Sequence, residues 1–266
     1  MIPLNFGLFW CGGNISYLRY LTFKSLRFFH PNSKILLYVS KNYNKNIHKW
    51  GGEKQDFEQE IDKDYKKEIS KLDVKIIEMD FFGNPNFCAI FQVDLFRWWA
   101  LYNGICNFYL DMDQIILRSF DTLPLDYDFI YSQFSNYDRP KYAPTGVLGC
   151  SKNNEFAKKM MGLVPKFYRP NVYNSSGPFV LEHALATENT GNSFNAPYNY
   201  FYPINCSRDV GKIYSGEFII PKESYSLHWY AGHPISQEFN KNYNEDFLKK
   251  SKDSISVFCK DKIGIL

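Results

Sequence analysis

The chain has 266 residues and a formal net charge of +3; 45% of its residues are hydrophobic and 18% are aromatic. So many apolar side chains exclude a disordered chain, and the charge is too small to indicate a nucleic-acid-binding protein. The six cysteines are scattered without a CxxC pair, which predicts free thiols in a reducing compartment. The start of the sequence does not have the pattern of a secretion signal, and no apolar run is long enough to span a bilayer. We therefore expect a cytoplasmic protein without a transmembrane segment.

The first half of the chain predicts strands that alternate with helices. Residues 3–10 are apolar and indicate a strand, and the turn after them leads into a helix that Asn14 is expected to cap. Residues 53–71 alternate acidic and basic side chains and predict a solvated helix. The other elements expected here are helices over 15–29 and 90–103 and strands over 34–40, 73–79 and 105–110. A strand, a helix and another strand in succession imply a parallel sheet with a right-handed crossover.

The second half of the chain is less regular. The elements expected there are strands over 128–134 and 145–150, a helix near 154–164, and a loop that turns into a helix over 174–186. Pro178 suits the first turn of that last helix. From Asn195 onward, turns and aromatic residues interrupt the pattern. Without a repeat or a linker, the simplest prediction is one α/β domain over residues 1–266, with a mixed, mostly parallel sheet flanked by helices.

Two aspartates end the apolar, aromatic run in NFYLDMDQIIL. Asp111 and Asp113 are one residue apart, and residues i and i+2 of a strand point to the same face, so we expect their carboxylates to converge. Two like charges that close need a cation or strong donors, and a hard divalent metal is the natural candidate. The alternative is an Asp-x-Asp that occurs by chance at the surface.

The helix before the aspartates carries Asp94 and Arg97, which share one face at spacing i, i+3. A solvated ion pair at the surface is the simplest interpretation. However, the helix leads into the strand that ends at Asp111, and open α/β sheets bind ligands at the carboxyl ends of their strands. An aspartate and an arginine at that edge suit sugar hydroxyls and phosphate oxygens respectively.

The segment VDLFRWWALYNGICNFYLDMDQII resembles the DXD-containing region of glycosyltransferase family 32, whose relatives include initiating mannosyltransferases and the glucosylating domains of large clostridial toxins. The family pattern is roughly S-D-x-x-R, a leucine, and then G-G-x-Y-x-D-x-D. The matching positions here are Asp94, Arg97, Leu101, Gly104, Tyr109, Asp111 and Asp113. FWCGG, SSGPFVLEHAL and SLHWYAGH are similar to further family elements in the same order. The sequence departs from the family at GICN, where paired glycines are usual, and at GHP in place of a terminal G-S-W.

The resemblance implies a GT-A-type, Rossmann-like fold with a donor pocket for a nucleotide-sugar. In that pocket Trp10 would stack on the nucleobase, Asp94 and Arg97 would hold the donor sugar, and Tyr109 and Met112 would line the same space. Residues 1–120 would form the nucleotide-sugar-binding part, and residues 121–266 the acceptor side and the C-terminal part.

The resemblance also implies a divalent cation, Mn²⁺ or Mg²⁺, at the aspartate pair. Asp113 would ligate it directly, Asp111 would contact the ribose and reach the metal through water, and His228 would supply another contact to the metal or the diphosphate. Together with Arg97, the two aspartates would form the catalytic set. A metal at the diphosphate stabilises the negative charge that grows on the leaving group.

These implications predict a retaining, metal-dependent glycosyltransferase of polysaccharide biosynthesis. The donor would be a UDP- or GDP-sugar, and the acceptor a glycan, a lipid-linked sugar or a protein hydroxyl. The site offers no obvious nucleophile, with Glu182 as a weak candidate, so a front-face mechanism is expected. One alternative is a non-catalytic nucleotide-sugar or glycan binder, which the GICN and GHP departures keep open. The other is a nucleotidyl- or phosphoryl-transferring enzyme, although the sequence lacks a G-x-x-x-x-G-K phosphate loop.

Several other residues are expected to have no catalytic role. His30 and His48 are predicted in loops or at the surface, and His183 and Arg118 in structural or surface positions. The surplus of aromatic side chains would suit peripheral attachment at the inner membrane surface, but a ring-rich core explains it equally well.

Overall fold

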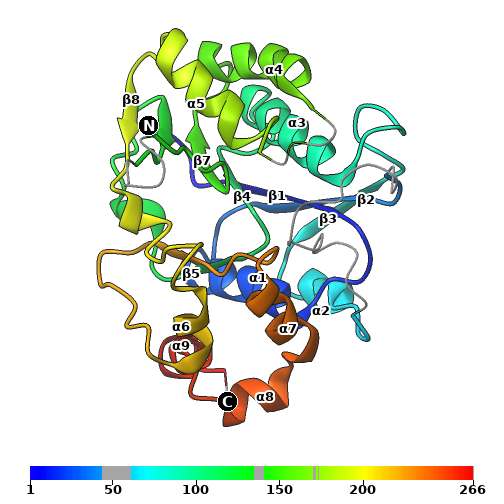
Figure 1. Ribbon diagram of the computed structural model, residues 1–266, viewed down its shortest axis with the longest axis vertical. Coiled ribbons are helices and arrows are strands. Elements are labelled where there is room, and N and C mark those ends of the chain that lie inside the picture. Colours follow the sequence, from blue (N-terminus) through cyan, green and yellow to red (C-terminus); the bar gives the residue numbers. More distant parts are fainter. Residues whose placement is uncertain (44–60, 135–140, 170–171, 173, 266) are drawn as a thin grey trace.

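Seven strands form one mixed sheet in the structure, a computed structural model that describes residues 1–43, 61–134, 141–169, 172 and 174–265 (Figure 1). The strands are β1 (Phe6–Cys11), β2 (Ile35–Ser40), β3 (Lys75–Met79), β4 (Phe108–Leu110), β6 (Phe129–Tyr131), β7 (Val147–Cys150) and β8 (Ser193–Asn195). Their order across the sheet is β3–β2–β1–β4–β7–β6–β8. β1 to β4 run parallel, β7 is antiparallel to β4 and β6, and β8 is parallel to β6. This confirms the predicted mixed, mostly parallel sheet.

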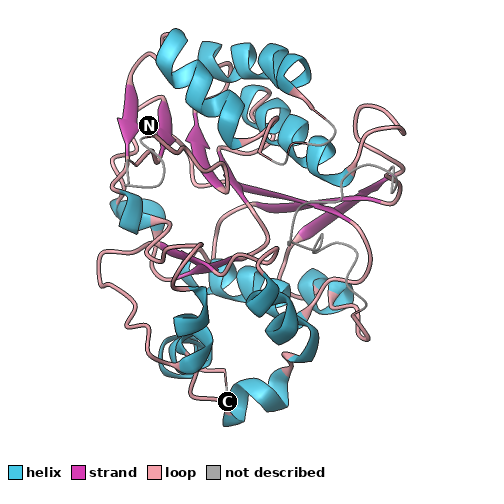
Figure 2. Cartoon of the chain, in the orientation of Figure 1, coloured by secondary structure: helices cyan, strands magenta, loops and turns pink. Residues whose placement is uncertain are grey.

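Helices cover both faces of this sheet (Figures 1 and 2). One face carries α3 (Ala89–Tyr102), α4 (Glu155–Phe167) and α5 (Pro178–Thr187). The other carries α1 (Tyr17–Phe29) and a second, antiparallel sheet of β5 (Gln114–Ile116) and β9 (Ser226–His228). The remaining helices are α2 (Lys66–Ser70), α6 (Val210–Ser215), α7 (Pro234–Asn242), α8 (Glu245–Lys250) and α9 (Ser254–Phe258), with shorter turns η2 (Phe120–Thr122), η3 (Tyr198–Tyr200) and η4 (Cys259–Ile263).

The central strands are buried on both sides, which explains why their sequences are continuous apolar runs. Every residue of β1 and of β2 is buried, as expected for parallel strands covered on both faces. A smaller apolar cluster joins α1 to the C-terminal helices around Leu21, Trp229 and Ile255. The fold therefore leaves the end of β1 and the turn after β4 at the boundary between two packed regions.

One local prediction was wrong, and another was incomplete, because His30 lies in a loop as predicted but is buried. Asn14 does not cap α1: the helix begins at Tyr17, and the Ser16 hydroxyl oxygen accepts the Arg19 amide at 3.3 Å. Ser16 is a strong N-cap residue itself, and the Asn14 side chain donates to the Ile61 carbonyl at 2.7 Å instead.

His30 is not a surface residue. Its ring is 3% exposed, lies 4.6 Å from the Phe6 ring between centroids, and its Nε2 accepts the Phe120 amide at 3.3 Å. The burial is explained by the Phe120 amide, which needs a hydrogen-bond acceptor inside the aromatic cluster and finds it in His30. His48 lies outside the described residues.

Residues 53–60 of the predicted helix over 53–71 lie outside the described residues. In the remainder, only Lys66–Ser70 is helical, and Ile69 anchors it in the core. All six cysteines are free thiols, as predicted, and five of them are buried. Among the helices of the described ranges, none combines the length and the apolar character needed to cross a membrane.

Candidate active site

Asp111 and Asp113 lie in the short turn between β4 and β5, not within a strand. β4 ends at Leu110, so the alternation of side chains along a strand does not bring the carboxylates together. The turn is fixed at both ends: the Asp111 amide donates to the Gly146 carbonyl at 2.8 Å, and the Trp229 amide donates to the Asp113 carbonyl at 3.0 Å. The predicted convergence of the two carboxylates is confirmed, but the turn produces it.

His228 completes a cluster with the two aspartates. One ligand atom from each of Asp111, Asp113 and His228 lies within 4.8 Å of the others. The imidazole Nε2 lies 2.8 Å from Asp113 Oδ2, and the Ala231 amide donates to the same oxygen at 2.9 Å. Two carboxylates and an imidazole are a donor set that suits Mn²⁺, and the carboxylates alone suit Mg²⁺. The residues present therefore fit a divalent cation.

Asp94 and Arg97 form a buried pair beside this cluster. Arg97 Nη2 lies 3.2 Å from Asp94 Oδ1 and 3.5 Å from Asp111 Oδ1, and the Asp94 and Arg97 side chains are each 5% exposed. The Ser176 hydroxyl donates to Asp94 Oδ2 at 2.6 Å. The interpretation as a solvated surface pair is thus wrong, because α3 turns this face inward. Sequence reasoning did not single out Ser176, whose side chain meets Asp94 only in the folded chain.

The Tyr109 hydroxyl fixes Asp111 from the other side. It donates to Asp111 Oδ1 at 2.7 Å, and its ring lies 4.9 Å below the Arg97 guanidinium. Tyr109 is completely buried. One carboxylate oxygen of Asp111 is therefore oriented by both a hydroxyl and a guanidinium, which is the kind of support that holds a metal ligand in place.

The two aspartates have different electrostatic surroundings. Burial raises the pKa of Asp111 above its ordinary value; the guanidinium of Arg97 opposes this, and the charge of Asp113 adds to it. Burial also acts to raise the pKa of Asp113, but His228, the Ala231 amide and Arg19 together hold it below its ordinary value. The surroundings thus favour the ionised form of Asp113. For Asp111, the nearby positive groups do not offset the effect of burial.

The Asp94 carboxyl shows the same competition. Burial raises its pKa, and the Arg97 guanidinium and the Ser176 hydroxyl oppose that effect. For Arg97, burial acts to lower the pKa, but Asp111, Tyr109 and Asp94 hold it above its ordinary value. The guanidinium is therefore a permanent positive charge between two carboxyl groups, Asp94 and Asp111.

Trp10 stands at the end of β1 against an arginine that sequence reasoning missed. Its indole N–H donates to the Gly13 carbonyl at 2.8 Å. The Arg19 guanidinium lies over the Trp10 ring at 4.5 Å and over the Trp229 ring at 5.5 Å. Arg19 is 1% exposed, although its position on a helix gives no sign of burial. The arginine covers one face of Trp10 and extends positive charge toward Asp113.

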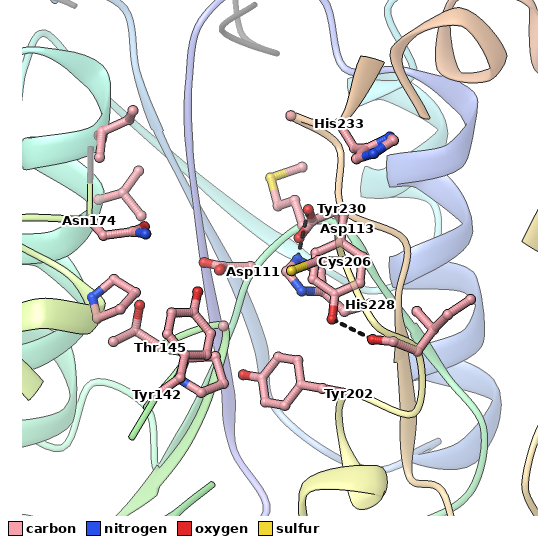
Figure 3. A pocket seen from close by; sticks show the side chains of 18 of the residues that line it. Asp111, Asp113, Tyr142, Thr145, Asn174, Tyr202, Cys206, His228, Tyr230 and His233 are labelled. Atoms are coloured by element: carbon pink, nitrogen blue, oxygen red, sulfur yellow. Dashed lines mark hydrogen bonds and ion pairs between the residues drawn. The ribbon is translucent and has the colours of Figure 1, made fainter. Parts of the chain in front are cut away.

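These groups surround a cavity of about 920 Å³, and Figure 3 shows Asp111, Asp113 and His228 at its wall. Its lining includes every residue that the sequence predicts for the donor and metal sites: Trp10, Asp94, Arg97, Tyr109, Asp111, Met112, Asp113 and His228. Glu182 is not among the lining residues; its Oε1 accepts the Ala143 amide at 3.4 Å. Arg118 packs on the Tyr225 ring, and His183 is exposed beside Phe167.

Two glycines let the backbone approach the carboxylates closely. A Cβ at Gly146 would lie 2.9 Å from Asp111 Oδ2, and a Cβ at Gly177 would lie 3.0 Å from Asp94 Oδ1. Contacts this short would force the carboxylates to move. Gly177 belongs to the SSGPFVLEHAL segment, but the sequence does not indicate the close approach of either glycine, which depends on which segments meet.

No model of a protein family matches the chain, and no curated protein matches it significantly. Solved structures with a similar arrangement include PaToxG glycosyltransferase, at 17% identity and a TM-score of 0.47 over 69% of each chain. The glycosyltransferase GlyE of Streptococcus pneumoniae TIGR4 has 17% identity and a TM-score of 0.49 over 85% of this chain. The galactosyltransferase LgtC, solved with donor and acceptor sugar analogs, has 14% identity and a TM-score of 0.44 over 92% of this chain and 99% of its own.

The chain spans about half of GlyE, 54% of its length. These likenesses are too low to transfer an activity or the role of any residue to this chain. Membership of glycosyltransferase family 32 stays a prediction.

Proposed function

We propose that the chain is a metal-dependent glycosyltransferase of the GT-A type, which transfers a sugar from a nucleotide-sugar to a hydroxyl acceptor. The observation that carries the proposal is the cluster of Asp111, Asp113 and His228, within 4.8 Å of one another in the same cavity as the buried Asp94–Arg97 pair. A surface Asp-x-Asp that arises by chance has no reason to gather a buried arginine, an imidazole and a cavity around it.

The charge balance of the site supports a divalent cation. The repulsion between Asp111 and Asp113 is part of what raises the pKa of Asp111, and a cation bound by both carboxylates would remove it. A bound Mn²⁺ or Mg²⁺ would supply Lewis-acid stabilisation of the diphosphate leaving group. In this proposal Asp113 and His228 hold the cation, and Asp111 contacts it while Tyr109 and Arg97 fix its orientation.

The donor sugar would lie against Asp94 and Arg97. Asp94 would accept hydrogen bonds from sugar hydroxyls, and Ser176 keeps its carboxylate in place. Arg97 Nε and Nη1 are buried and have no hydrogen-bond partner among the described residues, so they are donors available to a ligand oxygen. The base would stack on Trp10, which lines the cavity.

We further propose a retaining, front-face transfer. The acceptor oxygen bonds to the anomeric carbon, the bond from that carbon to the diphosphate oxygen breaks with its electron pair, and the hydroxyl proton passes to the departing diphosphate. Glu182 is unsuited to a double displacement because it lies outside the cavity lining. The same proposal includes a donor part over residues 1–120 and an acceptor part over residues 121–266. It also includes a role in polysaccharide biosynthesis and a cytoplasmic location.

The test is the release of free nucleotide from a panel of UDP- and GDP-sugars with Mn²⁺, followed with and without EDTA. We expect release from one donor, its loss with EDTA, and a loss of roughly 100-fold or more in Asp113→Asn, which keeps the shape of the side chain but not its charge. Asp246→Asn is the matched control, because Asp246 is exposed in the first turn of α8.

Calorimetry with the same donors separates the alternatives. Donor binding without release in the presence or absence of added sugars would favour a non-catalytic nucleotide-sugar binder. If no donor binds with Mn²⁺ present, the proposed donor site is wrong.

A further inference from the structure

Five aromatic side chains form a continuous wall along the cavity. Phe134 and Tyr142 are joined by an isolated β-bridge, with their rings 5.5 Å apart. The Phe134 ring lies 3.9 Å from that of Tyr198, which stacks on Tyr202 at 5.3 Å. The Tyr198 and Tyr230 hydroxyls are 3.5 Å apart. We call these five residues the aromatic wall; all of them line the cavity.

The aromatic wall leads directly to the candidate metal cluster. Tyr202 lies 5.7 Å from the His228 ring in an edge-on arrangement, and Tyr230 lies 4.1 Å from it. His228 in turn contacts Asp113. In Figure 3, Tyr142, Tyr202 and Tyr230 surround the space beside Asp111 and His228. A molecule on the wall would therefore lie next to the centre where the proposed transfer takes place.

Tyr230 is held in an unusual backbone conformation. Its φ is +53°, in the left-handed region that a bulky side chain rarely adopts. The Tyr230 hydroxyl donates to the Ile204 carbonyl at 3.0 Å, which ties the ring to a second segment of the wall. Strain of this kind persists only where the surrounding structure fixes it, and it concentrates at ligand sites. The position of this ring is thus built into the fold.

The wall offers ring faces together with polar groups. Phe134, Tyr142, Tyr198 and Tyr230 are half-buried, so each keeps some surface toward the cavity. Amide and hydroxyl side chains line the same cavity: Asn174, Asn199, Asn205, Thr145 and Ser207. A lipid chain would cover these polar groups without offering them a hydrogen bond, whereas a sugar has hydroxyls that can pair with them. Its C–H faces would lie on the electron-rich faces of the rings.

We propose that the aromatic wall is the acceptor subsite and that the acceptor is a saccharide whose ring stacks on Tyr142 and Tyr198. This inference rests on the proposed function and adds the chemical class of the acceptor to it. The role of the wall is to bind the acceptor and hold one hydroxyl toward the centre at Asp111 and His228.

The experiment measures the binding of neutral di- and trisaccharides to the whole chain by calorimetry and saturation-transfer NMR, alone and with Mn²⁺ and a nucleoside diphosphate. Tyr142→Ala and Tyr198→Ala should each weaken saccharide affinity about tenfold, the value expected for one lost stacking contact. Tyr142→Phe and Tyr198→Phe keep the ring and should stay within about threefold of the parent chain. Phe28→Ala is the control, because that ring is 49% exposed on α1 and lies outside the cavity lining.

Three results would overturn the proposal: no saccharide binding under either condition, binding that both alanine variants leave unchanged, or binding of dispersed farnesol in place of the saccharides. Donor hydrolysis is measured in parallel without acceptor. Hydrolysis without saccharide binding refutes the acceptor subsite alone, whereas saccharide binding without hydrolysis counts against the proposed transferase and leaves the aromatic wall as a glycan site.

Discussion

Gly146→Ala tests how strictly the backbone just before β7 positions Asp111. The added Cβ would lie 2.9 Å from Asp111 Oδ2, 3.2 Å from Gln114 Nε2 and 3.3 Å from the Tyr202 hydroxyl. An ordinary contact begins near 3.4 Å, so the carboxylate would have to move by about 0.5 Å. It cannot turn away freely, because Tyr109 holds its other oxygen at 2.7 Å.

We expect the substitution to cost about 1–3 kcal/mol of stability, the usual range for overpacking a buried site. A displacement of this size in a group that positions the reacting centre should lower donor hydrolysis roughly ten- to a hundredfold. Urea unfolding measures the first effect. Mn²⁺ binding, followed by electron paramagnetic resonance, and nucleotide release measure the second.

Two further glycines provide matched controls. A Cβ at Gly149 would lie 2.7 Å from Phe108 Cε1 in the core, so Gly149→Ala should destabilise the chain while a folded sample keeps its Mn²⁺ affinity. Gly162 has nothing within 4 Å of its added Cβ and lies inside α4, so Gly162→Ala should stabilise the chain by up to about 1 kcal/mol. If folded Gly146→Ala binds Mn²⁺ and releases nucleotide as the parent chain does, the positioning of Asp111 by this contact is refuted.

Substitutions at three other positions test separate parts of the structure. Arg97→Lys keeps the charge but loses Nε and Nη1, the two donors proposed for the ligand, so nucleotide release should fall roughly a hundredfold. Arg97→Met should cost about 3–5 kcal/mol in urea unfolding, because it leaves Asp94 and Asp111 without their cation. Arg19→Met removes the cation behind Trp10, so the inhibition constant of a nucleoside diphosphate should rise severalfold while that of pyrophosphate changes less. Burial lowers the pKa of His30 from 6.5 to about 4, so between these pH values the unfolded chain binds a proton that the folded chain does not. The contribution of neutral His30 to stability is therefore complete above pH 6.5, and the free energy of unfolding should fall by about 3 kcal/mol as the pH drops to 4. Urea unfolding of His30→Gln should lack this part of the fall.

Each of these expectations has a result that contradicts it. Full nucleotide release in Arg97→Lys would mean that charge alone is sufficient at that position. Equal weakening of both inhibitors in Arg19→Met would indicate general damage and not loss of a base platform. Parallel pH dependence in the parent chain and His30→Gln would show that His30 is not the titrating group, with His183→Gln as the exposed control.

The elements with strong local patterns could be predicted from the sequence. The apolar runs of β1 and β2 and the spacing of α1 and α3 determine their burial, and Pro178 begins α5 as expected. Errors arose where two local signals competed, as at the start of α1, where both Asn14 and Ser16 could cap the helix. The burial of His30 was missed because its pairing with the Phe120 amide joins residues far apart in the chain.

In the candidate site, too, residues close together in the sequence could be predicted, and residues brought together only by folding could not. Asp111 and Asp113 are neighbours in sequence, so their convergence could be expected even though a turn, and not a strand, produces it. Arg19, Gly146 and the aromatic wall depend on contacts between segments that no local pattern connects. Arg19 has an ordinary helical spacing, and only the folded chain brings it between the rings of Trp10 and Trp229.

The same contrast explains which part of the proposed chemistry the sequence could suggest. A metal and a diphosphate are bound by a few charged groups that can be close together in the sequence. Here one turn supplies two of them, Asp111 and Asp113. Recognition of an acceptor needs a surface, and here the aromatic wall joins residues far apart in the chain, of which Tyr202 and Tyr230 contact the His228 ring. Since the imidazole touches both Asp113 and the Tyr230 ring, a substitution on the aromatic wall that displaces His228 should also weaken Mn²⁺ binding. Mn²⁺ affinity therefore has to be measured in every variant of the wall before a loss of saccharide binding is assigned to stacking.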